Sequence, residues 1–227
     1  MKKTLPGWSF KTYLKYKIIW GSVVASCVFI LTAIPASAVG GSNVFFEKSC
    51  GSDNINGKRV LVAYESKHGS TADIAEKIGD VLCENGFRVD MRPALKVEDI
   101  SPYDAIVIGS PMYYATFLPG ALKFLERHKN ILAVKKVALF VTSTSVDKET
   151  GMVDKNLLRL ISSSVLNKFP EIKIIEPIGL MPGKFYFKEI FPVEVINFKQ
   201  TGYDEVGDLL NYDFVRSWTE EIAILLK

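Results

Sequence analysis

From Arg59 onward, uninterrupted apolar runs alternate with segments of helical periodicity, and this alternation constrains the possible folds more than any other feature. Three of the runs are typical of central parallel strands, which are buried on both faces. They cover residues 60–64, 105–108 and 137–141. Two further segments alternate apolar and polar residues, the second less clearly, and indicate half-exposed edge strands. They cover residues 87–91 and 172–175.

Apolar residues at helical spacing fill the segments between and after these runs. The periodic segments are 74–82, 118–125, 158–169 and 215–225. This alternation predicts βαβ units and therefore an α/β fold with a parallel sheet. With the two edge-type segments at its margins, the sheet should be doubly wound and five-stranded, in the order 2-1-3-4-5. Ligands bind beyond the carboxyl ends of strands in such folds, so we expect a site on the loops after Tyr64 and Ile108.

The loop after Tyr64 gathers hydroxyl groups and a glycine at the start of the expected helix. It comprises Ser66, Lys67, His68, Gly69, Ser70 and Thr71. Free N–H groups and the dipole at a helix N-terminus favour an anion, and hydroxyl donors suit a phosphate group that stays bound. The chain lacks GxxxxGK[ST] and has no GxGxxG after this strand, which argues against a nucleotide-hydrolysing or dinucleotide-binding loop. A phosphate site is therefore predicted, with an ordinary polar turn as the alternative.

Residues 64–71, with Ala75 and Ile78, resemble the flavodoxin signature, aromatic-x-Ser/Thr-x-x-Gly-x-Thr-x-x-x-Ala-x-x-aliphatic. Ala63 departs from it, because a larger residue is usual there. Residues 103–114 are similar to the third strand of flavodoxins and the loop that flanks their flavin. The resemblance covers residues 59–227 and implies a flavodoxin-like domain that binds FMN, with the phosphate on the first loop.

The resemblance also implies which residues surround the flavin ring. Backbone groups around Ser110 and Met112 would meet the ring edge, and Tyr113 or Tyr114 would stack on the ring, unless both tyrosines only pack in the core or its rim. A third loop, after the run 137–141, would cover the other side. The implied residues outside the phosphate loop are Ser110, Pro111, Met112, Tyr113, Tyr114, Thr142, Ser143 and Thr144. No catalytic residue emerges from these patterns.

The C-terminal half is similar to the flavodoxin-domain group that includes menaquinone-dependent protoporphyrinogen oxidase. The similar segments are 182–185, 207–213 and 215–218. Two departures put that oxidase activity in doubt. Ser110-Pro111 stands where the oxidase usually has Ala-Ser, and Tyr114-Ala115 where it has an aromatic residue and glycine. Five aromatic residues within 185–198 either dock a partner or close the core.

The N-terminal segment predicts a membrane anchor or a cleaved signal peptide. Residues 18–39 are uncharged and long enough to span a bilayer, which takes about 20 residues. Five lysines and no acid precede Val39, so the positive-inside rule keeps the N-terminus in the cytoplasm and the remainder outside. Ala36-Ser37-Ala38 also fits a signal cleavage site, which would release the protein. We expect residues 1–39 as this segment, 40–58 as a linker and 59–227 as the domain.

Charge and cysteine content narrow the possible partners. The net charge is +3, but without the five N-terminal lysines 23 basic residues face 25 acidic ones, so no nucleic-acid footprint is present. Two histidines and three cysteines without a CxxC pair give no indication of a metal site. Cys83 is expected to be an inert apolar residue. A Cys50–Cys83 disulfide is the alternative outside the cytoplasm.

Together these patterns predict an FMN-binding, flavodoxin-like redox protein that transfers electrons at the membrane. Its partner would be a redox protein or a quinone. One alternative is an enzyme, a quinone-linked oxidoreductase resembling protoporphyrinogen oxidase. The other is a scaffold domain that binds no flavin.

Overall fold

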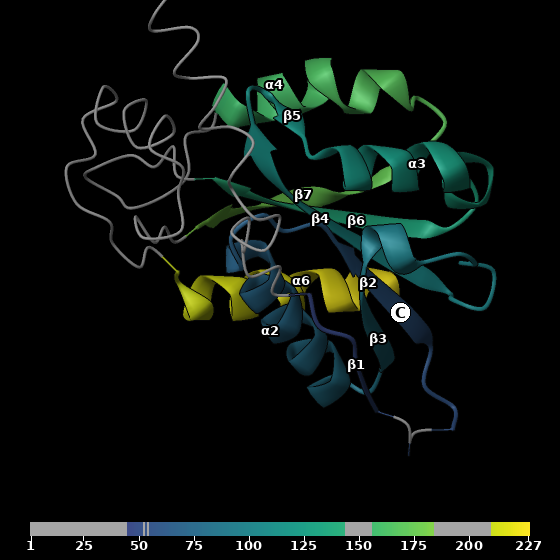
Figure 1. Cartoon of the computed structure of the whole chain (residues 1–227). Coiled ribbons are helices and arrows are strands. Elements are labelled where there is room, and N and C mark those ends of the chain that lie inside the picture. Colours follow the sequence, from purple (N-terminus) through teal and green to yellow (C-terminus); the bar gives the residue numbers. More distant parts are fainter. Residues whose placement is uncertain (1–44, 52, 54, 144–155, 184–209) are drawn as a thin grey trace, which may run out of the picture. The chain divides into compact units, whose positions relative to one another are not determined.

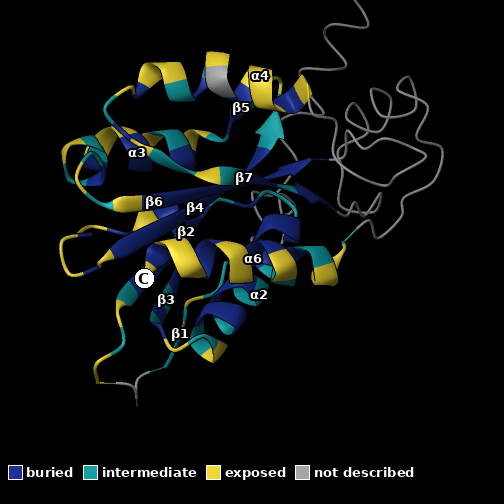
Figure 2. Ribbon diagram, turned by 180° about the vertical axis from the view of Figure 1, so that it is seen from behind, coloured by how far each residue is buried: buried dark blue, intermediate teal, exposed yellow. Residues whose placement is uncertain are grey.

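The structure is a computed structural model that describes residues 45–51, 53, 55–143, 156–183 and 210–227 (Figure 1). Within these ranges it forms a largely parallel sheet covered by helices on both faces (Figure 2). The predicted anchor or signal helix lies outside the described residues. Among the residues that are described, no helix is long and apolar enough to cross a membrane.

Among the described residues, the sheet has seven strands. They are β1 Lys48–Cys50, β2 Arg59–Tyr64, β3 Arg88–Pro93, β4 Ala105–Tyr113, β5 Thr116–Phe117, β6 Lys136–Ser143 and β7 Ile174–Pro182. Their order is β1-β3-β2-β4-β6-β7, and β5 pairs with β4. All neighbouring pairs are parallel except β1 with β3 and β4 with β5.

The prediction of a five-stranded sheet is therefore wrong in the number of strands and in the order of the whole sheet. The five parallel strands do follow one another as β3-β2-β4-β6-β7, but β1 extends the β3 edge and β5 is added to β4. Strand β1 also lies inside the predicted linker, 40–58. The last strand was expected at residues 172–175 but extends from Ile174 to Pro182. It is longer because pairing with β6 resumes beyond a register shift between Ala138 and Phe140.

Helices cover the two faces in pairs, α2 with α6 on one face and α3 with α4 on the other (Figure 2). They are α2 Ser70–Glu84, α3 Pro119–Leu132, α4 Asn156–Ser164 and α6 Tyr212–Leu226, with 3₁₀ turns η2 Ala94–Lys96 and η3 Leu166–Lys168. Each predicted helical segment overlaps one of these helices. The third segment ends early, at Ser164, and continues as η3.

Two apolar cores explain why the central strands show no polar alternation. In β2, Val60, Val62 and Tyr64 pack under α2 and α6, whereas Leu61 and Ala63 pack under α3 and α4. All five are fully buried. Because both faces of the strand are covered, an apolar residue is required at every position.

A disulfide joins the edge of the sheet to the neighbouring helix. Cys50, at the end of β1, is bonded to Cys83 in the last turn of α2. The expectation that Cys83 is an inert apolar residue is therefore wrong. Pairing of β1 with β3 places Cys50 beside α2, and this proximity depends on a strand that the sequence pattern does not reveal.

Candidate functional site

Three chain segments that follow parallel strands meet where the carboxyl ends of these strands lie. We call this side of the sheet the site edge. It comprises the carboxyl ends of β2, β4 and β6 with the residues that follow them. Strand register places Tyr64 beside Gly109, and Pro111 beside Thr142. The loop at residues 66–69, the continuation of β4 and the end of β6 are therefore neighbours, as the doubly wound topology predicts.

The first loop ends in a glycine conformation that opens α2. Gly69 has a φ of 90°, which favours glycine, and its N–H donates a hydrogen bond to Ser66 Oγ at 3.1 Å. Helix α2 begins at Ser70, and its N-cap makes no side-chain hydrogen bond. The helix N-terminus, which attracts anions, therefore begins directly at the predicted phosphate loop.

Hydrogen bonds tie this loop to the end of β6. The hydroxyls of Thr71 and Thr142 lie 2.7 Å apart and are buried. The Gly183 N–H donates to the Ser143 carbonyl at 2.9 Å, and Ser70 Oγ would lie 3.1 Å from a Cβ at Gly183. The structure thus brings the predicted residues Ser70, Thr71, Thr142 and Ser143 together. Thr144 lies outside the described residues.

The second predicted loop is mostly a strand. Residues 110–113 continue β4, which turns back through Tyr114 and Ala115 into β5. The expectation of a loop directly after Ile108 is wrong, because β4 stays paired with β6 as far as Pro111 and with β5 at Met112 and Tyr113. The Ser110 hydroxyl is fully buried, accepts from the Leu118 N–H at 3.1 Å and donates to the Pro111 carbonyl at 3.0 Å. Its side chain therefore supports the turn into α3.

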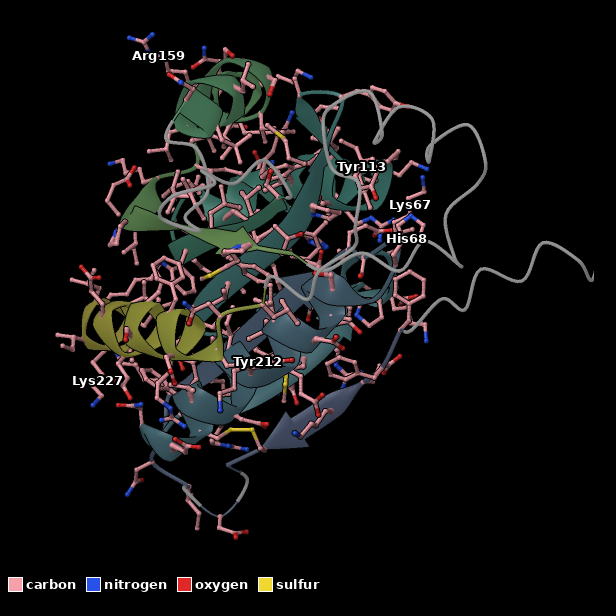
Figure 3. All side chains as sticks on the ribbon, turned by 90° about the vertical axis from the view of Figure 1, so that its left-hand side faces the viewer. Lys67, His68, Tyr113, Arg159, Tyr212 and Lys227 are labelled. Carbon is pink, nitrogen blue, oxygen red and sulfur yellow. A yellow bond between two sulfur atoms is a disulfide. The ribbon has the colours of Figure 1, made fainter. Side chains whose placement is uncertain are left out.

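The two predicted tyrosines differ in their surroundings. Tyr114 is 86% exposed at the tip of the β4–β5 hairpin. Tyr113 is half-buried, and the Lys67 ammonium lies 4.9 Å from the centre of its ring (Figure 3). A cation over an aromatic face is attracted by the ring quadrupole. Tyr114 thus has the more open ring for stacking, whereas Tyr113 links the hairpin to the first loop.

Replacing Ala115 by glycine should stabilise the protein by about 0.5–1 kcal/mol, because an L-residue in a left-handed conformation costs about 1 kcal/mol or more. Tyr114 and Ala115 have φ values of 48° and 60°, as a two-residue hairpin turn requires. Chemical denaturation measures the change. Ala133→Gly is the matched control. Ala133 has a right-handed helical conformation, so replacing it by glycine should destabilise the protein. Equal effects at the two positions would contradict this reading of the hairpin.

The sequence interpretation missed Glu65, which lies between β2 and the first loop. Its Oε2 atom is buried and accepts no hydrogen bond within the described residues. A Cβ at Gly120 would lie 1.9 Å from this atom, so the carboxyl packs against the first turn of α3. Burial raises the pKa of the Glu65 carboxyl. A glutamate directly after a five-residue apolar run is the sequence signal that could have identified it.

The raised pKa of Glu65 predicts a pH-dependent loss of stability. Between its ordinary value, about 4.3, and the raised value the folded state binds more protons, so stability falls as pH rises through this window. We expect Glu65→Gln to remove this fall, so that the variant gains stability over the wild type from pH 4 to pH 7. Denaturation at several pH values measures it. Glu98→Gln, at an exposed glutamate, controls for the lost charge, and an identical profile for both variants would contradict the assignment.

The fold and the site edge define a class of protein, the doubly wound α/β proteins of flavodoxin type. Residues 61–169 match the family described as "Flavodoxin domain". This match confirms the resemblance to flavodoxins that the first loop predicts. None of the curated proteins compared with the chain matches it.

Several solved structures superpose on this chain at low sequence identity. The apo form of an NADH:FMN oxidoreductase superposes with a TM-score of 0.50 and 11% identity, over 75% of this chain and 90% of that one. A flavodoxin from the domain Archaea has a TM-score of 0.49 and 16% identity, over 74% and 98%. For oxidised flavodoxin 2 from Bacillus cereus the values are 0.48 and 19%, over 74% and 97%.

Proposed function

We propose that this protein binds FMN at the site edge and serves as an electron carrier. The observation that carries the proposal is the first loop. It combines a glycine at φ 90°, an inward hydrogen bond to Ser66 and the start of α2 without a side-chain cap. These features suit the phosphate of FMN, since backbone N–H groups at a helix N-terminus bind anions.

Residues of this chain would bind and orient the cofactor. The Ser66 hydroxyl holds the loop in shape by accepting a hydrogen bond from the Gly69 N–H, directly before the N-terminus of α2. Lys67 adds positive charge beside the loop, and Tyr114 offers an exposed aromatic face at the hairpin tip. Bound FMN would supply one- and two-electron transfer, while the protein sets its orientation and electrostatics.

An absorption spectrum tests this proposal. After FMN is added to the purified protein and the excess is removed, we expect retained flavin bands and quenched flavin fluorescence. Tyr114→Ala should weaken binding about tenfold, as loss of a stacking contact of roughly 1 kcal/mol or more predicts. Tyr114→Phe keeps the ring and should bind like the wild type. If the wild type retains no flavin, the scaffold alternative takes precedence.

We further propose that residues 18–39 anchor the protein in the membrane and that the domain lies outside the cytoplasm. The lysines that precede this segment support the orientation. The Cys50–Cys83 disulfide supports it too, because disulfides persist mainly in oxidising compartments. A reporter fused after Lys227 that is active only outside the cytoplasm should be active. Activity of a reporter that works only in the cytoplasm would refute the placement.

The alternative function is that of a quinone-linked oxidoreductase. Its apolar substrate would pack against the aromatic residues within 185–198, which lie outside the described residues. The redox partner is therefore proposed only as a membrane-associated protein or a quinone.

A further inference from the structure

Residues 45–50 form an arm that is fastened along the edge of the domain. Its β1 portion pairs with β3, and the Cys50–Cys83 disulfide closes its far end. At its near end the Tyr64 hydroxyl accepts a hydrogen bond from the Phe46 N–H and donates one to the Phe46 carbonyl, both at 2.8 Å. The rings of Phe46 and Tyr64 stack, with 5.3 Å between their centres. The arm is thus held at both ends.

Ion pairs attach the middle of the arm to elements on either side of it. The carboxylate of Glu47 lies 2.7 Å from Arg92 and 3.0 Å from Lys96, at the end of β3 and in η2. On the other side, the ammonium of Lys48 lies 3.0 Å from Glu76 and 2.7 Å from Asp80, both in α2. Such partly exposed pairs each contribute little to stability. Because Glu47 and Lys48 carry opposite charges and find opposite partners, the pairs favour the observed register of β1 against β3 over a register shifted by one residue.

The direction of the arm determines where the chain joins the domain. Because β1 is antiparallel to β3, with Lys48 opposite Met91 and Cys50 opposite Val89, the arm begins at the carboxyl end of the parallel strands. Phe46 therefore contacts Tyr64, the last residue of β2, two positions before Ser66. Without the arm, the chain would join the folded domain at Arg59, the first residue of β2. Arg59 lies at the amino ends of the parallel strands, opposite the site edge. The arm moves the attachment point to the site edge.

The link between the apolar segment and this attachment point is short. From Val39 to Phe45 the chain takes six Cα–Cα steps, which span at most about 22 Å whatever their conformation. We infer that the arm keeps the site edge at the membrane surface, so that the surface it meets is the lipid headgroup layer. The electron partner would then be one that resides in or on the membrane. This inference rests on the proposed anchor and on the proposed FMN site.

Two matched labels in the full chain test the orientation. A fluorophore at Tyr114→Cys reports on the site edge, and one at Val134→Cys reports on the opposite edge, between α3 and the start of β6. The two positions are 86% and 84% exposed, and Cys27→Ala in both chains removes the unpaired thiol. Strand β4, from Ala105 to Tyr113, separates the two edges by about 26 Å. The proteins are reconstituted in phosphatidylcholine vesicles that contain a headgroup-nitroxide lipid.

We expect quenching of the Tyr114 label to exceed that of the Val134 label by at least about twofold, because a short-range quencher distinguishes edges this far apart. Equal quenching, or stronger quenching at Val134, would overturn the inference. So would a protein that does not stay with the vesicles. FMN retention is measured by absorption on the unlabelled wild-type chain in the same vesicles, because Tyr114→Cys itself removes the aromatic ring proposed to stack on the flavin. The readout does not depend on flavin, so failure of the orientation and failure of FMN binding are distinguishable.

A spacer controls for the short link without altering the folded domain. A flexible Gly/Ser insertion of about 20 residues after Asn43 lengthens the connection and should make the two labels equally quenched. A second variant, Cys50→Ser with Cys83→Ser and Tyr64→Phe, releases the arm and should shift the stronger quenching toward Val134. Circular dichroism checks that it folds. If neither change alters the ratio of quenching, the arm does not set the orientation.

Discussion

Replacing Cys50 and Cys83 by serine should lower the free energy of unfolding by about 3–4 kcal/mol. The disulfide closes a loop between residues 33 positions apart, and loss of such a cross-link increases the entropy of the unfolded chain by roughly this amount. Denaturation in urea, with the wild type under oxidising conditions as reference, measures the change. Release of β1 at the sheet edge should appear first, as faster amide exchange in residues 48–50.

Two comparisons separate the disulfide from a general effect of cysteine replacement. Cys27→Ser, in the N-terminal segment, should leave the stability of the domain unchanged. Treatment of the wild type with a thiol reductant should reproduce the loss seen in the double variant. A reductant-treated protein as stable as the untreated one would contradict the pairing of Cys50 with Cys83.

Replacing Gly109 by alanine should destabilise the protein by about 3 kcal/mol, which is at the upper end of the usual cost of overpacking. A Cβ at this position would lie 2.0 Å from the Cζ atom of Phe140. Phe140 is fully buried and packs edge-on against Trp218, so its ring has no free space into which it can move. Since Gly109 precedes Ser110 on β4, FMN retention should fall as well. Thermal or urea denaturation measures the stability.

Gly120→Ala is the matched control for Gly109→Ala. The three atoms nearest to its Cβ would all belong to the Glu65 carboxyl, at the end of a side chain with rotatable bonds, and alanine is the better helix former. We expect a loss below about 1 kcal/mol. In the double variant Gly109→Ala with Phe140→Leu, the two costs should not add, because the smaller side chain relieves the clash. Full additivity would show that Phe140 is not the cause.

The predictable strands and the unpredicted ones differ in length and burial. The runs in β2, β4 and β6 were recognised because helices cover both of their faces, so every position is apolar. Strands β1 and β5 have three and two residues, too few for an alternating pattern. Pairing with β3 and β4, elsewhere in the chain, makes them strands.

In the candidate site, too, some features could be predicted from the sequence and others could not. The loop from Ser66 to Thr71 could be predicted to join a strand to a helix, because a glycine and hydroxyl groups follow a buried strand and begin a helical segment. The extended path of residues 110–113 could not be predicted, since it depends on pairing with β6 at residues 110–111 and with β5 at residues 112–113. The bond between Thr71 and Thr142 and the burial of Glu65 against Gly120 also join separate elements.

The amino-acid sequence by itself determined the α/β class, the buried central strands and the turn from strand to helix at residues 66–71, because these features depend on local spacing and on burial of whole strands. Only the tertiary structure decided the disulfide, the docking of the N-terminal arm beside Tyr64 and the separate surroundings of Tyr113 and Tyr114. These depend on contacts between residues far apart in the chain. Such contacts arise from the path of the folded backbone and leave no periodic signal in the sequence.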